Sequence, residues 1–523
     1  MVVLWKLGIF GMHNLYVITV KPVKIKTSQI MPKQETLSRE DREFFSLVRK
    51  AIITNPFSSE RQHLDMKIAG FPAVKSGPHD IETTVAVIEQ RISDLEKKHD
   101  RIIQIYRNED RYLMEVAVQF WFYYRFRRGF DRHIRKQEHA GDEPIKLDLF
   151  SEMQEFLQVR GFEEEGIQRA IEHSFQFRRA FHFINRNLVG KSPAMRQLRY
   201  NLWNNVFTHN VDLYRRFLMN RMEDFSSLIL GETGTGKGTV AAAIGRSGYI
   251  PFDMRKQCFV ESFMQSFLSI NLSQFPETLI ESELFGHRKG SFTGAIDDYI
   301  GVFGRCSVYG AIFLDEIGEL SHPVQIKLLQ VLQDRVFYPV GSRQKERFQG
   351  RVIAATNRSL EDLRNKQIFR DDFYYRMCTD IISVPSLHRR IQEDSSELDD
   401  LLDVIVKRIV GEDSAELTNL VKSVVHDQLG KDYPWYGNVR ELEQCVRRVI
   451  LKKRYSGDMK ELDDTLCTQL IKGMEAGEIS AQNLTAGYCK LLYDRFGTYE
   501  EVAKRTSLDR RTATKYIKSW EQI

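Results

Sequence analysis

Apolar positions in the first third of the chain recur with the period of a helix. From Ile81 their spacings alternate between four and three residues as far as Leu95, and the pattern resumes at Ile102 and Tyr106. Charged residues fill most positions between them, as in an amphipathic helix or a heptad seam. Two interpretations of residues 81–106 stay open: a coiled coil that pairs subunits, or one helix packed within its own domain.

An aromatic and basic stretch follows at residues 120–136, where Phe, Trp and Tyr are interleaved with Arg. Interleaved rings and guanidinium groups can bind nucleic acid by stacking and phosphate contact. The same pattern is more typical of a helix with a buried aromatic face and arginines that extend to solvent. Residues 1–180 as a whole are predicted to be mainly helical.

The middle of the chain changes to short apolar runs that alternate with helical patterns. The runs at residues 226–230, 311–314 and 351–355 have the length of buried strands. Strands that alternate with helices predict a parallel α/β sheet with a ligand at the carboxyl ends of the strands.

A glycine-rich loop joins the first of these strands to a helical run. The loop comprises Gly231, Glu232, Thr233, Gly234, Thr235, Gly236, Lys237 and Gly238. Strand, glycine-rich loop and helix form the context of a P-loop, whose backbone N–H groups and helix N-terminus face phosphate oxygens. Lys237 would reach the β- and γ-phosphates. Gly238 replaces the usual Ser or Thr that binds Mg²⁺, and Thr239 is the candidate to substitute for it.

Polar residues stand at the ends of the other two strands. The second strand runs into Asp315 and Glu316, and the third ends at Asn357. A carboxylate pair in this position suits a site where Asp315 holds Mg²⁺ and Glu316 orients or deprotonates the attacking water. Asn357 is placed to sense the γ-phosphate.

The C-terminal residues 480–523 indicate three short helices, at 484–493, 499–506 and 510–520. Residues 481–523 carry eight Lys or Arg and five Asp or Glu, a net charge of +3. This pattern predicts a helix-turn-helix whose third helix enters the major groove of double-stranded DNA. A small helical lid or dimerisation unit is the alternative. The candidate DNA contacts are Arg510, Arg511, Thr512, Thr514, Lys515 and Lys518.

Composition narrows the class of protein without identifying a function. The 523 residues are 42% hydrophobic and 28% charged, as expected of a soluble protein with several domains. A net charge of +5 is too small to argue for nucleic acid, and six cysteines without a CxxC pair favour a reducing cytoplasm. The N-terminal apolar stretch has no uncharged run of membrane-spanning length, so no membrane contact is expected. Met31 is an alternative to Met1 as the first residue.

One further segment connects these motifs to a known family. Residues 281–287 (ESELFGH) are followed by Gly290, Ser291, Phe292, Thr293, Gly294 and Ala295. Together with the P-loop and the acidic pair, this segment resembles the bacterial sigma-54-dependent activators, a class of AAA+ ATPases, and their loop that contacts sigma-54. The family normally has alanine where Ser291 stands. Two glycines allow an exposed hairpin tip, and an exposed Phe in such a loop indicates a contact surface.

Other segments extend the resemblance over roughly residues 187–455. Val189 and Gly190 resemble the family's entry to the nucleotide site and would line the adenine. Asn271 stands where the family places a partner for its catalytic glutamate, here Glu316. Arg440 belongs to a segment that resembles the lid motif, in which this arginine contacts bound nucleotide.

Residues 369–376 (FRDDFYYR) resemble the family's trans-acting arginine segment. By this resemblance Arg370 and Arg376 would reach the γ-phosphate of a neighbouring subunit. The chain departs from the family at Tyr436, which replaces a proline, at residues 248–262, which are extra sequence, and at residues 388–394.

The resemblance implies a cytoplasmic bacterial transcription activator with an AAA+ domain over residues 187–395 and a helical lid over 396–455. Such a protein would form a homo-oligomeric ring, a hexamer or heptamer, and bind double-stranded DNA. It would hydrolyse ATP with Mg²⁺ to remodel the closed complex of sigma-54 and RNA polymerase, and residues 1–180 would control the ATPase. Gly238 supports the alternative of a DNA-binding regulator that uses nucleotide only as a switch. A different AAA+ machine, such as a helicase loader, would lack the loop at residues 290–295.

Overall fold

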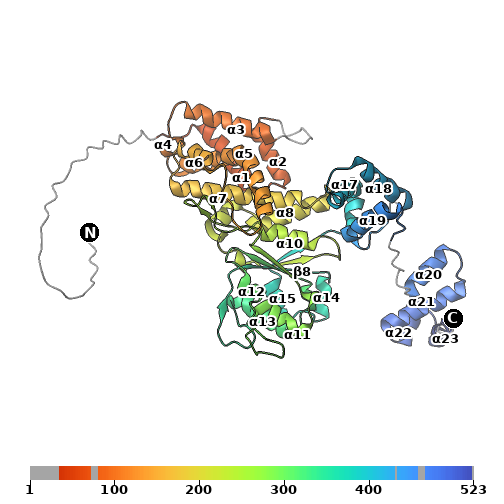
Figure 1. Ribbon diagram of the computed structural model, residues 1–523. Coiled ribbons are helices and arrows are strands. Elements are labelled where there is room, and N and C mark those ends of the chain that lie inside the picture. Colours follow the sequence, from red (N-terminus) through yellow and green to blue (C-terminus); the bar gives the residue numbers. More distant parts are fainter. Residues whose placement is uncertain (1–34, 72–80, 430–432, 458–465, 521–523) are drawn as a thin grey trace, which may run out of the picture.

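The computed structural model describes residues 35–71, 81–429, 433–457 and 466–520. The expectations for the N-terminal apolar stretch and for Met31 lie outside these ranges. The described residues form an N-terminal helical region, a sheet with helices on both faces, a helical lid and a C-terminal group of helices (Figure 1). None of the described helices combines the length and the hydropathy needed to cross a membrane.

Helices make up the N-terminal region, as its apolar pattern predicts. In α5, Phe122, Phe126 and Phe130 are buried, whereas Arg125 and Arg128 are exposed. The aromatic and basic stretch is therefore a helix with a buried aromatic face. The helices of this region are α1 (Arg39–Ile53), α2 (Ser59–Ile68), α3 (Ile81–Glu96), α4 (Ile102–Ile105), α5 (Asn108–Ala140), α6 (Phe150–Gln158) and α7 (Glu164–Phe181).

The apolar seam at residues 81–106 does not form one continuous helix. α3 ends at Glu96, Arg101 has a left-handed backbone with φ 48°, and α4 begins at Ile102. Val85, Ile88 and Ile92 are buried in a core shared with α5. The seam therefore packs within its own domain, as the second interpretation expects, but as two helices rather than one.

Five parallel strands form the sheet, and their side chains alternate between two apolar cores. In β8, Ile353 and Ala355 belong to the core shared with the N-terminal helices, whereas Val352 and Ala354 belong to the opposite core. A parallel sheet buried on both faces requires near-continuous apolar strands, which is why these runs are visible in the sequence. The predicted α/β fold is confirmed. The strand order is β4 (Phe267–Asn271), β5 (Ala311–Asp315), β8 (Arg351–Thr356), β1 (Ser227–Leu230) and β9 (Asp380–Ser383).

Helices cover both faces of this sheet (Figure 1). On the side of the N-terminal region lie α8 (Pro193–Phe207) and α10 (Lys237–Gly245). On the other side lie α11 (Glu277–Phe285), α12 (Val302–Arg305), α13 (His322–Asp334), α14 (Leu360–Asn365) and α15 (Asp371–Met377). The lid consists of α16 (Leu387–Glu393), α17 (Ser396–Val410), α18 (Ala415–Gln428) and α19 (Asn438–Lys452). The C-terminal helices are α20 (Leu466–Glu475), α21 (Ala481–Phe496), α22 (Tyr499–Thr506) and α23 (Arg510–Trp520).

The extra sequence at residues 248–262 forms a short antiparallel hairpin of β2 (Phe252–Asp253) and β3 (Cys258–Phe259). This hairpin packs on the N-terminal helices. Phe259 stacks on Phe175 of α7 with 4.2 Å between ring centroids. Glu172 Oε1 accepts a hydrogen bond from the N–H of Phe252 at 2.9 Å, and Glu172 Oε2 accepts one from the Tyr249 hydroxyl at 2.8 Å. The hairpin therefore joins the N-terminal region to the α/β domain.

Candidate functional site

The glycine-rich loop leaves β1 and ends at α10. Gly234 has a left-handed backbone with φ 82°, which glycine adopts without steric cost. A Cβ atom on Gly234 would lie 2.2 Å from the carbonyl oxygen of Gly437 in the lid, so no larger residue fits there. Gly236 is the N-cap of α10, so the free N–H groups of the first helical turn are next to the loop. This is the backbone geometry expected of a phosphate-binding loop.

Lys237 is the first residue of α10, and its side chain lies against the loop. Its Nζ donates hydrogen bonds to the carbonyl oxygens of Gly231 at 2.9 Å and Glu232 at 3.3 Å. Burial lowers the pKa of Lys237, while the negative charges of Glu316 and Asp315 act in the opposite direction. The two carboxylates and the lysine thus lie close together at the carboxyl ends of the strands.

The acidic pair has an unusual backbone. Glu316 has φ 56°, and its N–H donates to Asp315 Oδ1 at 3.1 Å. A left-handed conformation in a residue other than glycine costs energy and is frequent at active sites. Asn271, at the end of β4, pairs in register with Asp315. Its Oδ1 accepts hydrogen bonds from the N–H and the hydroxyl of Ser273, and no hydrogen bond among the described residues joins Asn271 to Glu316.

The third strand end and the lid both contact the loop. Asn357 Nδ2 donates to Thr233 Oγ1 at 3.4 Å. Asn438, at the start of α19, donates to Glu232 Oε2 at 3.0 Å and to the carbonyl of Thr233 at 3.2 Å. Arg440 is exposed, and its Cβ would lie 3.0 Å from a Cβ on Gly234. Sequence reasoning placed Arg440 here but missed Asn438, although Asn438 lies within the same lid motif.

A buried ion pair links the lid to the segment expected to line the adenine. Arg390 donates to Glu397 Oε2 at 2.6 and 3.0 Å and to the carbonyl of Val189 at 2.7 Å. Glu397 Oε1 accepts from the N–H groups of Lys191 at 2.5 Å and Ser192 at 2.6 Å. The side chains of Arg390 and Glu397 are 5% and 0% exposed. Sequence reasoning noted residues 388–394 only as a departure, and missed that Arg390 holds Val189.

Gly190 lies directly against this ion pair. Its φ is 124°, and a Cβ on it would lie 2.2 Å from Glu397 Oε2. Arg199 of α8 donates to the carbonyl oxygens of Leu188 and Gly190. The entry segment is therefore fixed from two sides, by the lid and by α8.

The two candidate trans-acting arginines have different environments. The side chain of Arg370 is 39% exposed and pairs with Asp372 at 2.9 Å, while its backbone N–H donates to Oε1 of the buried Gln325. Arg376 is half-buried and donates to the carbonyl of Leu332 at 2.9 and 3.0 Å. Within the described residues, neither arginine forms a hydrogen bond with the glycine-rich loop of its own chain.

The expected contact loop is a hairpin on the face opposite the N-terminal helices. His287 and Tyr299 exchange two backbone hydrogen bonds of 2.9 Å at its base, and the N–H of Gly290 donates to the carbonyl of Ala295 at 2.8 Å. Phe292 is 37% exposed and its ring lies edge-on to His287, with centroids 4.9 Å apart. Thr293 and Gly294 are exposed at the tip.

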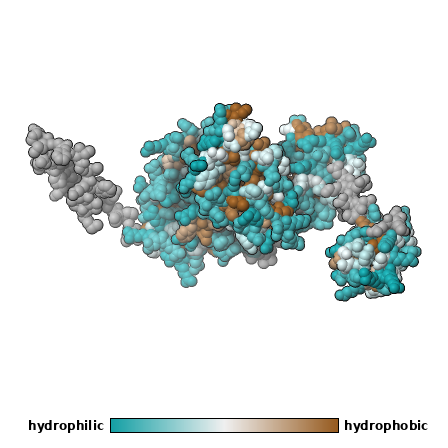
Figure 2. Space-filling view, turned by 90° about the horizontal axis from the view of Figure 1, so that it is seen from below, coloured by the Kyte–Doolittle hydropathy of each residue, from teal (hydrophilic) through white to brown (hydrophobic). Residues whose placement is uncertain are grey.

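Apolar side chains gather on this side of the molecule. Figure 2, seen from below Figure 1, shows brown apolar atoms near the middle of the face. The exposed large apolar residues of the hairpin, its flank, α11 and α13 are Leu279, Phe292, Ile296, Ile300 and Ile326. Exposed apolar groups that cluster in this way mark contact surfaces.

The C-terminal residues form the helices that the sequence predicts, with α22 and α23 separated by a turn. Ala513 and Ile517 of α23 are buried against α21 and α22, which leaves Arg511, Lys515 and Lys518 exposed. Arg510 is also exposed and pairs with Glu500 of α22 at 2.9 Å.

The two candidate threonines of α23 bond within the chain. The Thr512 hydroxyl donates to Asp509 at 2.5 Å, and the Thr514 hydroxyl donates to the carbonyl of Arg510 at 2.8 Å. Arg511, Lys515 and Lys518 are exposed and have no ion-pair partner among the described residues, so of the six candidate DNA contacts they are better placed for phosphate than the threonines.

The residues near Lys237 fit Mg²⁺ better than a metal held entirely by protein. No group of three or more His, Cys, Asp or Glu in the described ranges could hold a metal ion. Mg²⁺ usually keeps several waters and binds one or two carboxylates plus substrate phosphates. Asp315 supplies one carboxylate, and Thr239 is exposed on the first turn of α10.

Comparison with known proteins places the central region in a family. Residues 207–383 match the family described as the Sigma-54 interaction domain. The Nif-specific regulatory protein of Klebsiella pneumoniae is 38% identical over 262 residues, which are 50% of this chain and 43% of that protein. The "Uncharacterized protein in HyuA 5'region" of Pseudomonas sp. (strain NS671) is 35% identical over 258 residues, 49% of this chain and 81% of that protein.

Among solved structures, NtrX from Brucella abortus in complex with ATP matches with a TM-score of 0.38 and 20% identity. The match covers 69% of this chain and 76% of that one. The chain spans less than half the length of the Klebsiella regulator. The family assignment follows from the sequence matches.

Proposed function

The chain belongs to the family of sigma-54-dependent activators, and we propose that it hydrolyses ATP to remodel the closed complex of sigma-54 and RNA polymerase at promoters. The observation that carries the proposal is the presence of a nucleotide site and the 290–295 hairpin on one α/β domain. Lys237 begins α10 after the loop that leaves β1, Asp315 ends β5 and Glu316 follows it, and the hairpin lies on the face away from the N-terminal helices.

ATP hydrolysis would use the chain's own residues in separate roles. Lys237 would exchange its contacts with the loop carbonyls for the β- and γ-phosphates, and Glu316 would orient or deprotonate water. Asp315 would hold Mg²⁺, which when bound neutralises charge on the phosphates. Val189 and Gly190 would line the adenine, and Asn357 and Arg440 would contact the nucleotide. Asn271, at the end of β4, would act as the partner of Glu316.

The arginines support a composite site completed by a neighbouring subunit in a homo-oligomeric ring. Arg370 is presented at the surface on a backbone fixed by Gln325, so it is ready to enter another subunit's site. Arg376 would first have to leave the carbonyl of Leu332. In other phosphate-cleaving enzymes such arginines contribute about 10³–10⁵-fold to the rate.

The first experiment is ATP hydrolysis as a function of protein concentration, with Lys237→Ala and Arg370→Ala alongside. A rate per subunit that rises with concentration and falls in both variants would support the ring. Arg358→Ala is the matched control, because the side chain of Arg358 is 38% exposed and pairs with a carboxylate, Glu319, at 2.8 Å. A rate that is independent of concentration and of Arg370 would contradict the composite site.

The hairpin at residues 290–295 is the proposed contact with sigma-54. Phe292→Ala should abolish binding to sigma-54 and transcription from a sigma-54 promoter, while ATP hydrolysis persists. Val308→Ala is the control, since Val308 is 52% exposed but lies outside the apolar group that includes Phe292. Unchanged transcription by Phe292→Ala would rule out this role.

The C-terminal helices are the proposed DNA-binding unit, with α23 in the major groove. Arg511→Ala should weaken DNA binding and reduce its dependence on salt by about one phosphate contact. Lys490→Ala, on α21, is the control. Equal affinities and salt dependences for Arg511→Ala and the unmodified chain would count against α23 as the contacting helix.

The N-terminal helices are proposed to control the ATPase through the hairpin of β2 and β3. Deleting residues 1–180 would expose the core that they share with the sheet, so a point change is the better test. Phe259→Ala removes the stack on Phe175 and should change the basal ATP hydrolysis rate. Phe496→Ala, a change of a partly exposed C-terminal residue, is the comparison variant. Identical hydrolysis rates for both variants would argue against regulation by the N-terminal helices.

Gly238 favours one second candidate, a DNA-binding regulator that uses nucleotide as a switch without turnover. It is exposed in the first turn of α10, where a P-loop usually supplies a hydroxyl to Mg²⁺. Phosphate release by the purified chain decides between the two functions. Release no faster than that of Lys237→Ala would favour the switch.

A further inference from the structure

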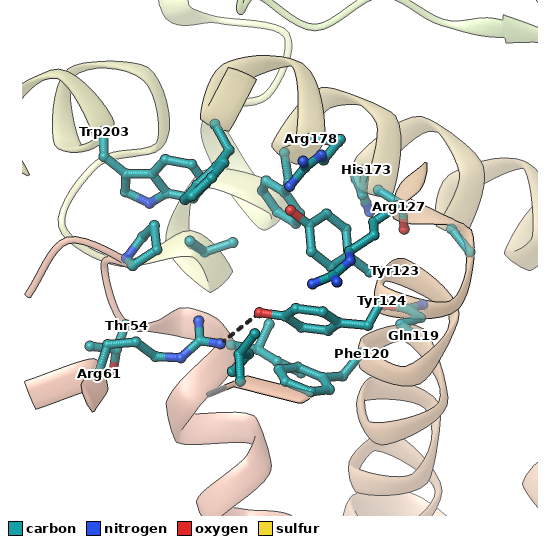
Figure 3. A pocket seen from close by; sticks show the side chains of 18 of the residues that line it. Thr54, Arg61, Gln119, Phe120, Tyr123, Tyr124, Arg127, His173, Arg178 and Trp203 are labelled. Atoms are coloured by element: carbon teal, nitrogen blue, oxygen red, sulfur yellow. Dashed lines mark hydrogen bonds between the residues drawn. The ribbon is translucent and has the colours of Figure 1, made fainter. Parts of the chain in front are cut away.

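A cavity of about 310 Å³ lies within the N-terminal helical region, away from the nucleotide site (Figure 3). Its wall combines residues of α5, α7 and α8 with the ends of α1 to α3. This volume is at the lower end of the range for small-molecule pockets, about 300–1,000 Å³, and suits a molecule of one or two rings. The aromatic and basic stretch of α5 supplies part of the wall.

Aromatic side chains form much of the lining. Phe120 and Tyr124 of α5 lie with their ring centroids 4.7 Å apart, and Phe177 and Trp203 lie 6.2 Å apart. Figure 3 shows the rings of Tyr123, Tyr124 and Trp203 around the same space. Flat side chains around a narrow space favour a planar ligand that stacks on them.

The lining is also cationic. It contains four arginines and one carboxylate, Asp65. Arg61 pairs with Asp65 at 2.9 Å, and Arg178 pairs with Asp131 at 2.7 Å. Arg215 differs, because no carboxylate of the described residues lies within ion-pair distance of it, and its side chain donates only to Gln119 Oε1 at 3.3 Å. Burial lowers the pKa of Arg215, so a nearby anion would stabilise its charge.

Two buried polar atoms of the lining have no hydrogen-bond partner among the described residues. They are Nε1 of Trp203 and Nδ1 of His173, and each residue is 6% exposed. The indole N–H can only donate. In Figure 3 the nitrogen edge of Trp203 is turned to the side of the cavity where Thr54 and Arg61 lie. Buried polar groups are rarely left unpaired, so an unpaired donor here indicates a missing acceptor.

His173 adds the opposite requirement. Its Nε2 lies 3.1 Å from Met219 Sδ, and a thioether sulfur carries no hydrogen, so Nε2 must be the donor of this contact. Burial lowers the pKa of His173 well below its usual value, so the ring is neutral and Nδ1 is an acceptor. A ligand with an oxyanion and a hydroxyl or amino group would satisfy both atoms.

We propose that this cavity binds a small aromatic anion, with its ring among the aromatic side chains and its carboxylate, or a comparable oxyanion, near the unpaired N–H of Trp203. None of the residues assigned to ATP, sigma-54 or DNA lines this cavity. It gives the N-terminal helices a ligand to sense, and that regulatory part of the inference depends on the proposed function.

Helix α8 connects the cavity to the nucleotide site. Trp203 lies on α8, and Asn205 two residues later donates to Ser227 Oγ at 2.9 Å and to Asp380 Oδ2 at 2.6 Å, at the starts of β1 and β9. Arg199 of the same helix holds the carbonyl of Gly190. A ligand that shifts or rigidifies α8 would therefore change the entry to the nucleotide site.

The test is a titration of the full chain, without nucleotide, by calorimetry. The probes are benzoate, 4-hydroxybenzoate and 2-naphthoate, with benzamide and benzamidine as the neutral and cationic counterparts. We expect saturable binding of the anions only. Trp203→Phe keeps the ring but removes the N–H, and should weaken anion binding about tenfold, which corresponds to about 1.4 kcal/mol. Trp121→Phe is the matched control, because Trp121 is a buried tryptophan of α5 outside the lining.

Three results would overturn the proposal: no saturable binding of any of the three anions, equal binding of benzamidine, or equal affinities for Trp203→Phe and Trp121→Phe. ATP hydrolysis with and without the tightest anion is the second measurement. If the chain binds the anion but does not hydrolyse ATP, the ligand site stands and the proposed function is rejected. If the chain hydrolyses ATP but binds none of the anions, the proposed function stands and the ligand site is rejected.

Discussion

The buried pair of Arg390 and Glu397 allows a quantitative test of how the lid holds the entry to the nucleotide site. Glu397→Ala leaves Arg390 with only the carbonyl of Val189, in a position where 5% of its side chain is exposed. Removing one partner of a buried ion pair costs about 3–5 kcal/mol. The N–H groups of Lys191 and Ser192 also lose their acceptor, at about 1–3 kcal/mol each where water cannot replace it. We expect the lid to lose at least about 4 kcal/mol of unfolding free energy.

Urea unfolding followed by tryptophan fluorescence measures this loss, because Trp435 is buried in the core of the lid. Asp400→Ala is the matched control. Asp400 is also on α17 and pairs with Lys191 at 2.9 Å, but the two side chains are 30% and 74% exposed, and exposed pairs contribute only about 0–1 kcal/mol. Equal and small effects of Glu397→Ala and Asp400→Ala would refute the reasoning.

A double variant separates the charge from the hydrogen bonds. Arg390→Met with Glu397→Leu removes both charges, and replacing a whole buried pair with apolar groups is often close to neutral. The N–H groups of Lys191 and Ser192 would still lack an acceptor, so the double variant should recover only part of the stability. Its KM for ATP should be higher than that of the unmodified chain, because Arg390, which holds the carbonyl of Val189, has been replaced. Full recovery of stability with an unchanged KM would mean that the pair matters only through its charge.

Three further predictions follow from single positions. Gly238→Ser should raise ATP hydrolysis at limiting Mg²⁺, because the added hydroxyl restores an oxygen ligand for the metal. The side chain has room, since a Cβ at Gly238 meets only a ring carbon of Phe313, at 3.8 Å. An unchanged dependence of the hydrolysis rate on Mg²⁺ concentration would mean that this position does not limit the reaction. Ser291→Ala should leave transcription intact and raise the free energy of unfolding by about 1 kcal/mol, because Ser291 Oγ is buried without a hydrogen-bond partner among the described residues. A lower midpoint temperature in thermal unfolding would contradict this. Burial lowers the pKa of His133 to about 4 in the folded chain, whereas a histidine in the unfolded chain has a pKa of about 6.5. Between these two pH values the unfolded chain binds a proton that the folded chain does not, so the free energy of unfolding falls by about 3 kcal/mol as pH drops from about 6.5 to 4. His133→Phe should remove that part of the acid sensitivity measured by urea unfolding, and identical pH profiles would disprove it.

The parts of the site that could be predicted from the sequence are those that depend on which residues follow one another along the chain. The strand before Gly231 and the strand before Asp315 are apolar runs followed by polar residues, and the sheet places their ends together because parallel strands share a carboxyl edge. Arg390, Glu397 and Asn438 could not be found in this way. Each contacts residues about 200 positions away, and such pairings leave no periodicity in the sequence.

The same distinction explains the N-terminal region. The heptad spacing from Ile81 was compatible with a coiled coil because periodicity shows that a helix has an apolar face, not what covers it. The structure covers it with α5, whose aromatic residues need a large apolar partner. Likewise, the extra residues 248–262 have no recognisable motif, since their role depends on Phe175 and Glu172, which precede them by more than 70 residues.

The attachment of this hairpin has a mechanical consequence for the nucleotide site. Arg179 of α7 is fully buried and donates to the carbonyl of Gly248, and burial lowers its pKa to about 9. Among the described residues no carboxylate forms an ion pair with Arg179, and burial of an unpaired cation is costly. The negative charge of Glu261 and the rings of Phe175 and Phe263 offset that cost only in part. The N-terminal region thereby holds the chain just beyond α10, a nine-residue helix that begins at Lys237. A helix of that length spans about 13 Å and moves as a rigid unit, so a displacement of α7 at Gly248 would reach Lys237 with little loss.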